Sequence, residues 1–233
     1  MYKMKEDYIV ESEKIWDSIA KSFDKTRRKP WQQCLDFIKE ISEGSVVADV
    51  ACGNGRHLIP CTKKCKKVIG LDISRKMLEI VKEKTIKENI SNVCLIHSTA
   101  EEIPLKDNTI DAVLYIAALH NIYGKENRIK SLKEIKRILK KDSKAIISVW
   151  SRYTNKFRKS FQNTNLYSKK IEFGDKHIYW RKDGLNIPRF YHLYGKKELV
   201  EDLEEAGFRI IKVKGVKIKS EKYNDNYFAV VTK

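Results

Sequence analysis

Short apolar runs alternate with helical periodicity from residue 45 to residue 150, and this alternation is the strongest constraint on the fold. The apolar runs read SVVADVA, KVIGLD, NVCLIHSTA, IDAVLYIAA and KAIISVW, and the helical segments between them cover residues 56–64, 74–89 and 125–139. Strands that are apolar along their whole length and separated by helices form parallel sheets covered on both faces. The sequence therefore predicts an α/β fold built from βαβ units.

Further elements flank this core on both sides. They are helices over residues 8–23, 31–41 and 196–206 and two final strands over residues 208–216 and 226–233. After residue 150 the alternation breaks into a polar, aromatic and basic segment. We therefore expect an N-terminal helical lid over residues 1–44 and a domain over residues 45–233 that carries an insertion at residues 151–190.

A glycine-rich loop follows the first predicted strand in the sequence VVADVACGNGRHL. That strand ends in Asp49, and Gly53 and Gly55 lead into a helix, where glycines let a cofactor approach the backbone and unpaired N–H groups favour an anion. The spacing differs from the dinucleotide pattern GxGxxG. The second strand ends at Asp72, where an acid binds the hydroxyls of a ribose. The alternative for Asp72 is a solvated acid at a strand end.

These segments resemble a known enzyme class. In order, DVACGNG, GLDIS, STAEEIPLKDNTIDAVLYIAALHNI and EIKRILKKDSKAIISVW are similar to the motifs of class I S-adenosylmethionine-dependent methyltransferases. The resemblance implies a Rossmann-like, mostly parallel seven-stranded sheet flanked by helices, with S-adenosylmethionine as the cofactor. It assigns cofactor contacts to Asp49, Ala51, Gly53, Asn54, Gly55, Asp72, Ile73, Ala100, Glu101, Ile116 and Ala117. Ala51 stands where the family usually has glycine.

A narrower resemblance covers nearly the whole chain. The segments SFDKTRRKPW, IAALHNI, VWS and PRFYHLYGKKELVEDLEEAGF are similar to the eukaryotic tRNA wobble-uridine carboxymethyl methyltransferases. Those enzymes esterify a 5-carboxymethyl group on the first anticodon base and work with a small zinc-binding activator protein. The resemblance implies tRNA as the substrate and such an activator as a partner. Asn121 stands where a second histidine is usual, which puts the role of that histidine in question.

The chemistry of such a reaction favours cations over a base. A carboxylate is already ionised at neutral pH, so it needs orientation toward the methyl group rather than deprotonation. We predict that Arg27 and Arg189 bind the carboxylate, because guanidinium forms bidentate pairs with it, and that His120 acts with them. As alternatives, Arg27 contacts the cofactor's own carboxylate and His120 caps a helix.

A second group of residues is predicted to contact the nucleotide. It comprises Arg28, Lys29, Trp31, Asn121, Arg152, Tyr191 and His192. Trp31 has the alternative of packing in the core. The basic stretch SRYTNKFRKSFQNTNLYSKK interleaves six cations with Tyr153, Phe157, Phe161 and Tyr167, a composition typical of proteins that grip single-stranded RNA loops. The alternative is a solvated insertion.

The charge balance supports a polyanionic partner. Lys and Arg number 48 against 31 Asp and Glu, giving a net charge of +17, which attracts RNA, DNA or an anionic membrane. No apolar run is long enough to cross a membrane and the first residues do not resemble a signal peptide, so we expect a cytoplasmic protein without a membrane partner. The five cysteines fit reduced thiols. Cys52, His57, Cys61 and Cys65 lie close in sequence but contain no CxxC pair, so no metal site is predicted.

Two questions stay open at this level. The third predicted strand, over residues 92–100, lies at a sheet edge in the usual class I order, where an activator protein could add a strand. The alternative covers are the N-terminal helices or a second copy. For function, the alternatives to tRNA methylation are methylation of a small acidic metabolite and a non-catalytic RNA-binding or cofactor-binding module.

Overall fold

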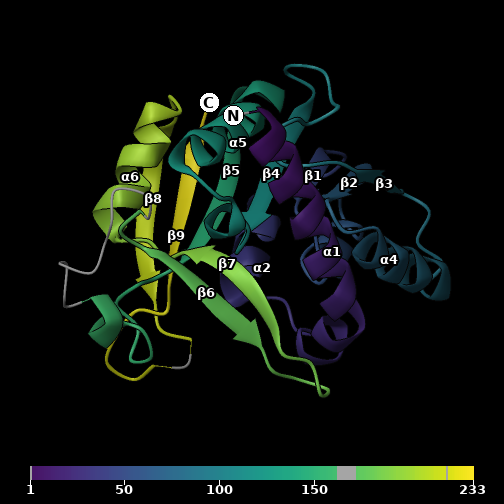
Figure 1. The fold of residues 1–233 in the computed structure, drawn as a ribbon. Helices are drawn as coiled ribbons and strands as arrows, with labels where there is room; N and C mark the ends of the chain where they lie inside the picture. The colour runs from purple at the N-terminus through teal and green to yellow at the C-terminus, as the bar shows by residue number, and fades with distance from the viewer. Residues whose placement is uncertain (1, 162–171, 219) are drawn as a thin grey trace.

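The computed structural model describes residues 2–161, 172–218 and 220–233, and its centre is one mixed sheet (Figure 1). Within these residues the strand order is β3-β2-β1-β4-β5-β9-β8. The strands are β1 (Val46–Val50), β2 (Lys67–Asp72), β3 (Val93–His97), β4 (Ile110–Ile116), β5 (Leu139–Trp150), β8 (Arg209–Val216) and β9 (Asn226–Thr232). β1 to β5 pair in parallel, and β9 runs antiparallel to both β5 and β8. The predicted mostly parallel seven-stranded sheet is confirmed.

Two helical layers cover the sheet. Helices α2 (Gln32–Glu40), α3 (Leu58–Cys61) and α4 (Arg75–Lys87) lie on one face, and α5 (Lys125–Ile138) and α6 (Lys196–Glu205) lie on the other. Alternate residues of each strand point to opposite layers: Val47 packs in the cluster with α2 and α3, whereas Ala48 packs in the cluster with α5 and α6. This alternation explains why the central strands read as continuous apolar runs.

Helix α1 (Tyr2–Thr26) is the longest helix in the described part of the chain, and it packs against α4 and the strand β7 (Ile187–His192). Its Asp17 accepts hydrogen bonds from the Ser74 hydroxyl (2.6 Å) and the Lys76 N–H (3.1 Å) at the start of α4. Near its end, Asp24 accepts a bond of 2.8 Å from the Asn54 amide. The helix is therefore fixed along its length to the elements that follow β1 and β2.

The insertion contains a hairpin that the sequence analysis did not predict. Strands β6 (Asp175–Trp180) and β7 (Ile187–His192) pair antiparallel as a separate two-stranded sheet. Phe157 and Phe161, expected to stack on RNA bases, are instead buried in a small cluster with the hairpin residue Ile178. They were assigned wrongly, because their rings fill the space beneath the hairpin. Tyr153 is exposed, and Tyr167 lies outside the described residues.

The remaining differences concern boundaries and edges. The helix predicted over residues 56–64 is limited to the four residues of α3, because residues 51–57 form the turns of the glycine loop. β3 and β8 are the two edges of the large sheet, as expected for β3. None of the described helices combines the length and apolar character that a membrane crossing requires.

Candidate active site

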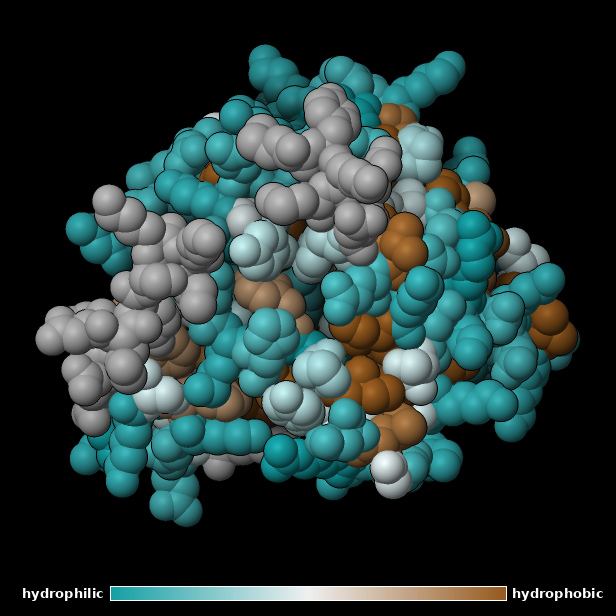
Figure 2. Space-filling view, viewed as in Figure 1, coloured by the Kyte–Doolittle hydropathy of each residue, from teal (hydrophilic) through white to brown (hydrophobic). Residues whose placement is uncertain are grey.

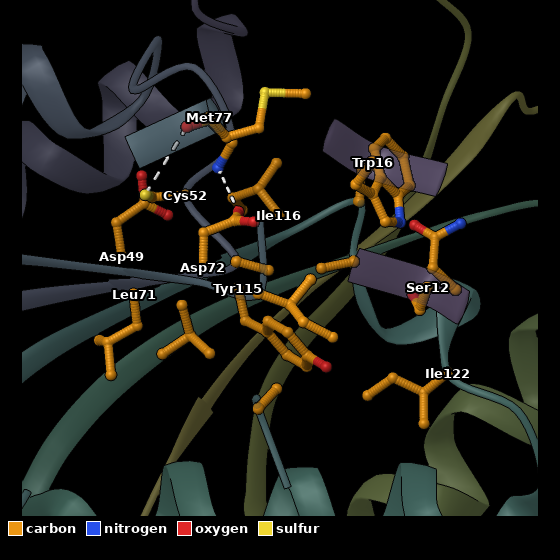
Figure 3. Close-up of a pocket in the computed structure, with 18 of the residues that line it drawn as sticks. Ser12, Trp16, Asp49, Cys52, Leu71, Asp72, Met77, Tyr115, Ile116 and Ile122 are labelled. Carbon is orange, nitrogen blue, oxygen red and sulfur yellow. Dashed lines mark hydrogen bonds between the residues drawn. The ribbon is translucent and has the colours of Figure 1, made fainter. Parts of the chain in front are cut away.

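A pocket lies at the carboxyl ends of β1, β2 and β4 and is closed on its other side by α1 (Figure 3). The close-up places Asp49 and Asp72 on one side and Ser12 and Trp16 of α1 on the other. The chain runs outward from β1 through β2 to β3, and then resumes on the opposite side of β1 with β4. Open α/β sheets bind ligands at this point of reversal.

The glycine loop connects the ends of β1 and β2. Its backbone has positive φ at Ala51 (55°), Gly53 (53°) and Gly55 (76°), a conformation that favours glycine. Gly53 lines the pocket, but Gly55 does not. A Cβ added at Gly55 would lie 3.0 Å from a methyl group of Val81, so this glycine permits close packing against α4.

Two buried acids give the pocket its electrostatic character. Asp49 is 2% exposed, and its Oδ2 has no hydrogen-bond partner among the described residues. Burial, together with the charge of Asp72, raises the pKa of Asp49 to about 8. Burial also raises the pKa of Asp72 to about 6, although Asp72 accepts N–H bonds from Gly53 (2.7 Å) and Ser74 (2.8 Å). A cationic ligand would stabilise both carboxylates in their charged form.

These features fit S-adenosylmethionine. Its ammonium and sulfonium charges suit the unpartnered oxygen of Asp49, and Asp72 retains lone pairs for ribose hydroxyls. Most other predicted cofactor residues line the same pocket: Ala51, Asn54, Ile73, Ala100, Glu101, Ile116 and Ala117. The Asn54 amide is engaged by Asp24 and by the carbonyl of Arg27 (2.9 Å), so it ties the end of α1 to the loop.

A buried cation faces the same pocket from the hairpin. Arg189 of β7 is 6% exposed, and no carboxylate in the described part of the chain lies within ion-pair distance of it. Its guanidinium lies over the rings of Trp16 (5.5 Å), Trp180 (5.0 Å) and Tyr191 (5.0 Å), and its Nε has no partner among described residues. Burial lowers the pKa of Arg189, and nearby Arg27 lowers it further. Such a site is suited to an anion.

Arg27 approaches from the end of α1. It lies over the rings of Phe23 (5.8 Å) and Trp180 (5.6 Å) and lines the pocket. A third arginine, Arg56, was not predicted from the sequence; it also lines the pocket, and its guanidinium lies 4.6 Å from the Trp31 ring. Burial and the charge of Arg27 lower the pKa of Arg56 to about 10. The charge of Arg27 therefore acts on both Arg56 of the glycine loop and Arg189 of the hairpin.

His120 lies between these cations and the sheet. It is fully enclosed, and its Nδ1 accepts a hydrogen bond of 3.2 Å from the Trp150 N–H while its ring stacks on Tyr191. Burial and Arg189 lower the pKa of His120 to about 3, so the ring is neutral at pH 7 with its proton on Nε2. Its side chain is thus bonded to the backbone of β5 and does not cap a helix, which was the alternative role for His120.

The structure separates the predicted nucleotide contacts into two groups. Trp31, Asn121 and Tyr191 line the pocket. Trp31 also packs against Phe228, which is the core packing given as its alternative, and its contact with a nucleotide stays a prediction. Arg28 and Lys29 are exposed and are not among the lining residues.

Arg152 and His192 were assigned wrongly to the pocket. His192 is buried between Asp175 (2.8 Å) and Glu198 (2.8 Å), and Arg152 pairs with Glu198 and donates to the Phe173 carbonyl (2.9 Å). The guanidinium of Arg152 pairs with a carboxylate, and both ring nitrogens of His192 face carboxylates, while burial lowers the pKa of His192. They fasten the hairpin to α6 rather than contact a ligand.

The thiols do not form a metal site in the described residues. No group of three or more His, Cys, Asp or Glu side chains there is arranged to hold a metal ion. His57 lines the pocket, and burial lowers its pKa to about 3. Cys61 is fully buried, where burial raises its pKa and keeps the thiol protonated.

Comparison with known proteins places this site in a class. Residues 48–147 match a family model described as a methyltransferase domain. A methyltransferase structure from Methanosarcina mazei superposes with a TM-score of 0.72 at 18% identity, covering 88% of this chain and 98% of that one. A complex between the Haloferax volcanii Trm112 methyltransferase activator and a methyltransferase gives a TM-score of 0.64 at 15% identity, covering 93% and 96%. Residues 48–147 therefore form a methyltransferase domain, and the chain has the Rossmann-like fold of S-adenosylmethionine-dependent methyltransferases.

Relatives identified by sequence narrow the comparison. The tRNA (carboxymethyluridine(34)-5-O)-methyltransferase alkbh8 of Xenopus tropicalis is 36% identical over 59% of this chain and 20% of that protein. The tRNA (carboxymethyluridine(34)-5-O)-methyltransferase of Schizosaccharomyces pombe is 28% identical over 84% of this chain and 88% of its own length. The demethylmenaquinone methyltransferase of Staphylococcus aureus is 29% identical over 86% of both. The chain spans only about a fifth of the Xenopus protein, which is much longer.

Proposed function

We propose that this chain transfers a methyl group from S-adenosylmethionine to the carboxylate of a 5-carboxymethyl group on the wobble uridine of tRNA. The observation that carries the proposal is Arg189, a buried guanidinium with no ion-pair partner among the described residues. An unpaired buried charge is costly unless a ligand completes it. The names of two relatives, in Xenopus and Schizosaccharomyces, support tRNA carboxymethyluridine as that ligand.

The residues around Arg189 suit a reaction that needs orientation. When bound, S-adenosylmethionine supplies an electrophilic methyl group. Arg189 binds the substrate carboxylate through its planar fork, and the three rings around it restrict how the guanidinium turns. Because the product ester is neutral, its attraction to Arg189 is weaker than that of the substrate. The same contact thus favours binding of the acid and release of the ester.

No general base is required in this proposal. His120 remains neutral at physiological pH because its pKa is about 3, and its proton lies on Nε2 because Nδ1 accepts from Trp150. Its role is to donate a hydrogen bond from Nε2 and to support Tyr191 by stacking at 5.2 Å. Asn121 donates to the Phe190 carbonyl at 3.3 Å, so it stabilises the hairpin at the position where the related enzymes have a histidine.

Helix α1 serves as the lid of the pocket in this proposal. Tyr8, Trp16 and Phe23 line the pocket from one stripe of the helix. The Tyr8 hydroxyl donates to the Asn121 carbonyl and accepts from the Tyr123 N–H (3.0 Å). These two bonds fix the lid beside the short helix of residues 119–121 that carries His120. A lid over the cofactor would exclude water, which strengthens the electrostatic contacts of the arginines.

A second candidate is methylation of a small carboxylic acid. Arg189 would bind any carboxylate, and the demethylmenaquinone methyltransferase relative indicates that this family includes small-molecule enzymes. The net charge of +17 favours tRNA, because a small acid needs no such field. Affinity for tRNA should fall steeply between low and physiological salt as counterions are released. A flat dependence on salt would favour the small acid.

The proposal also includes an activator protein that pairs with β3. This strand is an edge of the sheet, and its residues are all partly exposed. The Haloferax complex with an activator supports such a partner. The Leu95 side chain packs in the apolar cluster between the sheet and helices α2 and α3. The partner would therefore pair with the backbone of β3 rather than contact this side chain. A monomer that is soluble and fully active when purified alone would contradict the need for an activator.

The experiment that tests the function is nucleoside mass spectrometry. Bulk tRNA that carries the free acid is incubated with the protein and isotopically labelled cofactor, then digested to nucleosides. The expected result is the labelled methyl ester of 5-carboxymethyluridine, formed at least about tenfold more slowly with Arg189→Ala and at the normal rate with the exposed control Ile211→Ala. Label in a small acid but never in tRNA would overturn the proposal, and cofactor binding without any transfer would indicate a non-catalytic module.

A further inference from the structure

The β6–β7 hairpin has two chemically distinct faces. Side chains alternate along each strand, so Trp180, Arg189 and Tyr191 face the pocket and α1. His177, Tyr179 and their paired neighbours on β7 point the other way. The second face packs on no helix of the described chain along most of its length, since His177 and Tyr179 are both exposed.

This outer face carries a continuous row of rings. We define the aromatic stripe as Tyr123, Phe190, His177 and Tyr179. Tyr123 meets Phe190 edge to face at 5.1 Å, Phe190 meets His177 at 6.2 Å, and Tyr179 follows His177 on the same face of β6. The side chains of Tyr123 and Tyr179 at its ends are 47% and 46% exposed. Large rings left in water in a row mark an interaction surface.

The stripe leads to the pocket at one end. Phe190 lies between Arg189 and Tyr191, whose side chains face the pocket. Tyr123 contacts the ring of Tyr8 at 5.7 Å, and Tyr8 itself lines the pocket. A nucleotide held in the pocket would therefore have its chain neighbours within reach of the stripe.

The other end of the stripe is cationic. The guanidinium of Arg181 lies over the Tyr179 ring at 5.3 Å. The tip of the hairpin is joined to the end of α1 by the Lys25–Asp183 ion pair at 3.1 Å, and the two elements lie side by side there (Figure 1). The exposed Arg28 and Lys29 follow α1 directly in the sequence. Figure 2 shows the side of the molecule on which Figure 1 draws the hairpin. The surface there is mostly hydrophilic, with hydrophobic residues exposed in places.

We propose that the aromatic stripe binds unpaired bases next to the methylated nucleotide, with phosphates contacting the cations at the hairpin tip. The inference rests on the proposed function, since it supplies the neighbouring bases. Base stacking needs ring faces beside positive charge, which is the combination found here. The chain's net charge of +17 and Arg181 over the Tyr179 ring favour a polyanion over a protein as the occupant of the stripe.

The test compares Tyr179→Ala, Tyr179→Leu and Tyr179→Phe, with Ile211→Ala on β8, at a comparably exposed apolar residue, as the control. Two quantities are measured: the Kd for a fluorescently labelled anticodon stem-loop, and the KM for that RNA against the KM for the free nucleoside 5-carboxymethyluridine. Stacking is sequence-tolerant and needs a ring, so Ala and Leu should weaken RNA binding and raise its KM by about fivefold or more. Phe should restore both values, and the KM for the nucleoside should not change.

The outcomes separate the two proposals. Wild-type protein that methylates no RNA overturns the proposed function and the stripe together. If the wild-type protein methylates RNA but Tyr179→Ala leaves the Kd and the KM for RNA unchanged, the stripe proposal alone is overturned. If Tyr179→Leu and Tyr179→Phe retain RNA binding equally well, the stripe proposal is also overturned. An apolar contact without a ring would then suffice, as for a protein partner.

Discussion

The carboxylate of Asp72 accepts a hydrogen bond of 2.7 Å from the Gly53 N–H, which joins the end of β2 to the glycine loop after β1. Its second oxygen accepts from the Ser74 N–H at the start of α4. The acid therefore holds the loop in place and presents its remaining lone pairs to the pocket. Loop geometry and cofactor recognition depend on the same side chain.

Asp72→Ala should weaken cofactor binding by about 2 kcal/mol, because the ribose hydroxyls lose a charged acceptor and the loop loses its tether. Titration calorimetry measures the change. Glu79→Ala, an exposed acid on α4, serves as the control and should bind as the wild type does. Unchanged affinity in Asp72→Ala would remove this residue from the site.

The buried Asp49 should make stability depend on pH. Its pKa is about 8 in the folded protein against about 4 in the unfolded chain, so the folded state binds the extra proton between these values. The contribution is fully present below about pH 4 and is lost as pH rises through 8. The difference in free energy of unfolding between Asp49→Asn and wild type should thus grow in favour of the variant from pH 5 to pH 8. Denaturant titrations at these pH values measure it, and a constant difference would contradict the assignment.

Ala51→Gly should stabilise the protein by about 1 kcal/mol. Ala51 has φ 55°, where a Cβ is unfavourable and glycine is not. The matched control is Ala48→Gly in β1, where φ is not positive and glycine should destabilise. Thermal and denaturant unfolding give both values. If Ala51→Gly also destabilises, the loop backbone is not strained at this position.

Arg189→Ala and Arg27→Ala should each lower kcat by at least about tenfold while changing cofactor affinity little, since charged hydrogen bonds to the substrate are lost. Arg189→Lys keeps the charge without the fork and should recover only part of the rate. Arg209→Ala, an exposed arginine on β8, is the control. A variant that loses cofactor affinity and regains full rate at saturating cofactor has lost a contact to the cofactor's own carboxylate instead.

The large sheet could be predicted because its central strands β1, β2 and β4 are buried on both faces, which leaves continuous apolar runs in the sequence. The β6–β7 hairpin could not, because its two faces mix rings and cations, as in the alternation of Trp180 with Tyr179. Because the hairpin was not predicted, the alternation of side chains along β7 could not be used. His192 and Arg189 are three residues apart on that strand and so point to opposite faces, and only Arg189 faces the pocket. Arg56 was missed because nothing local distinguishes it from a solvated arginine.

The position of β9 has a consequence for how the sheet is completed. Residues 226–232 form a strand between β5 and β8, so β8 joins the sheet only through a strand that follows it in the sequence. Until β9 is in place, β5 and β8 have no partner on that side, and the apolar layer that packs against them stays open to water. The core therefore closes only when residues 226–232 have paired on both sides.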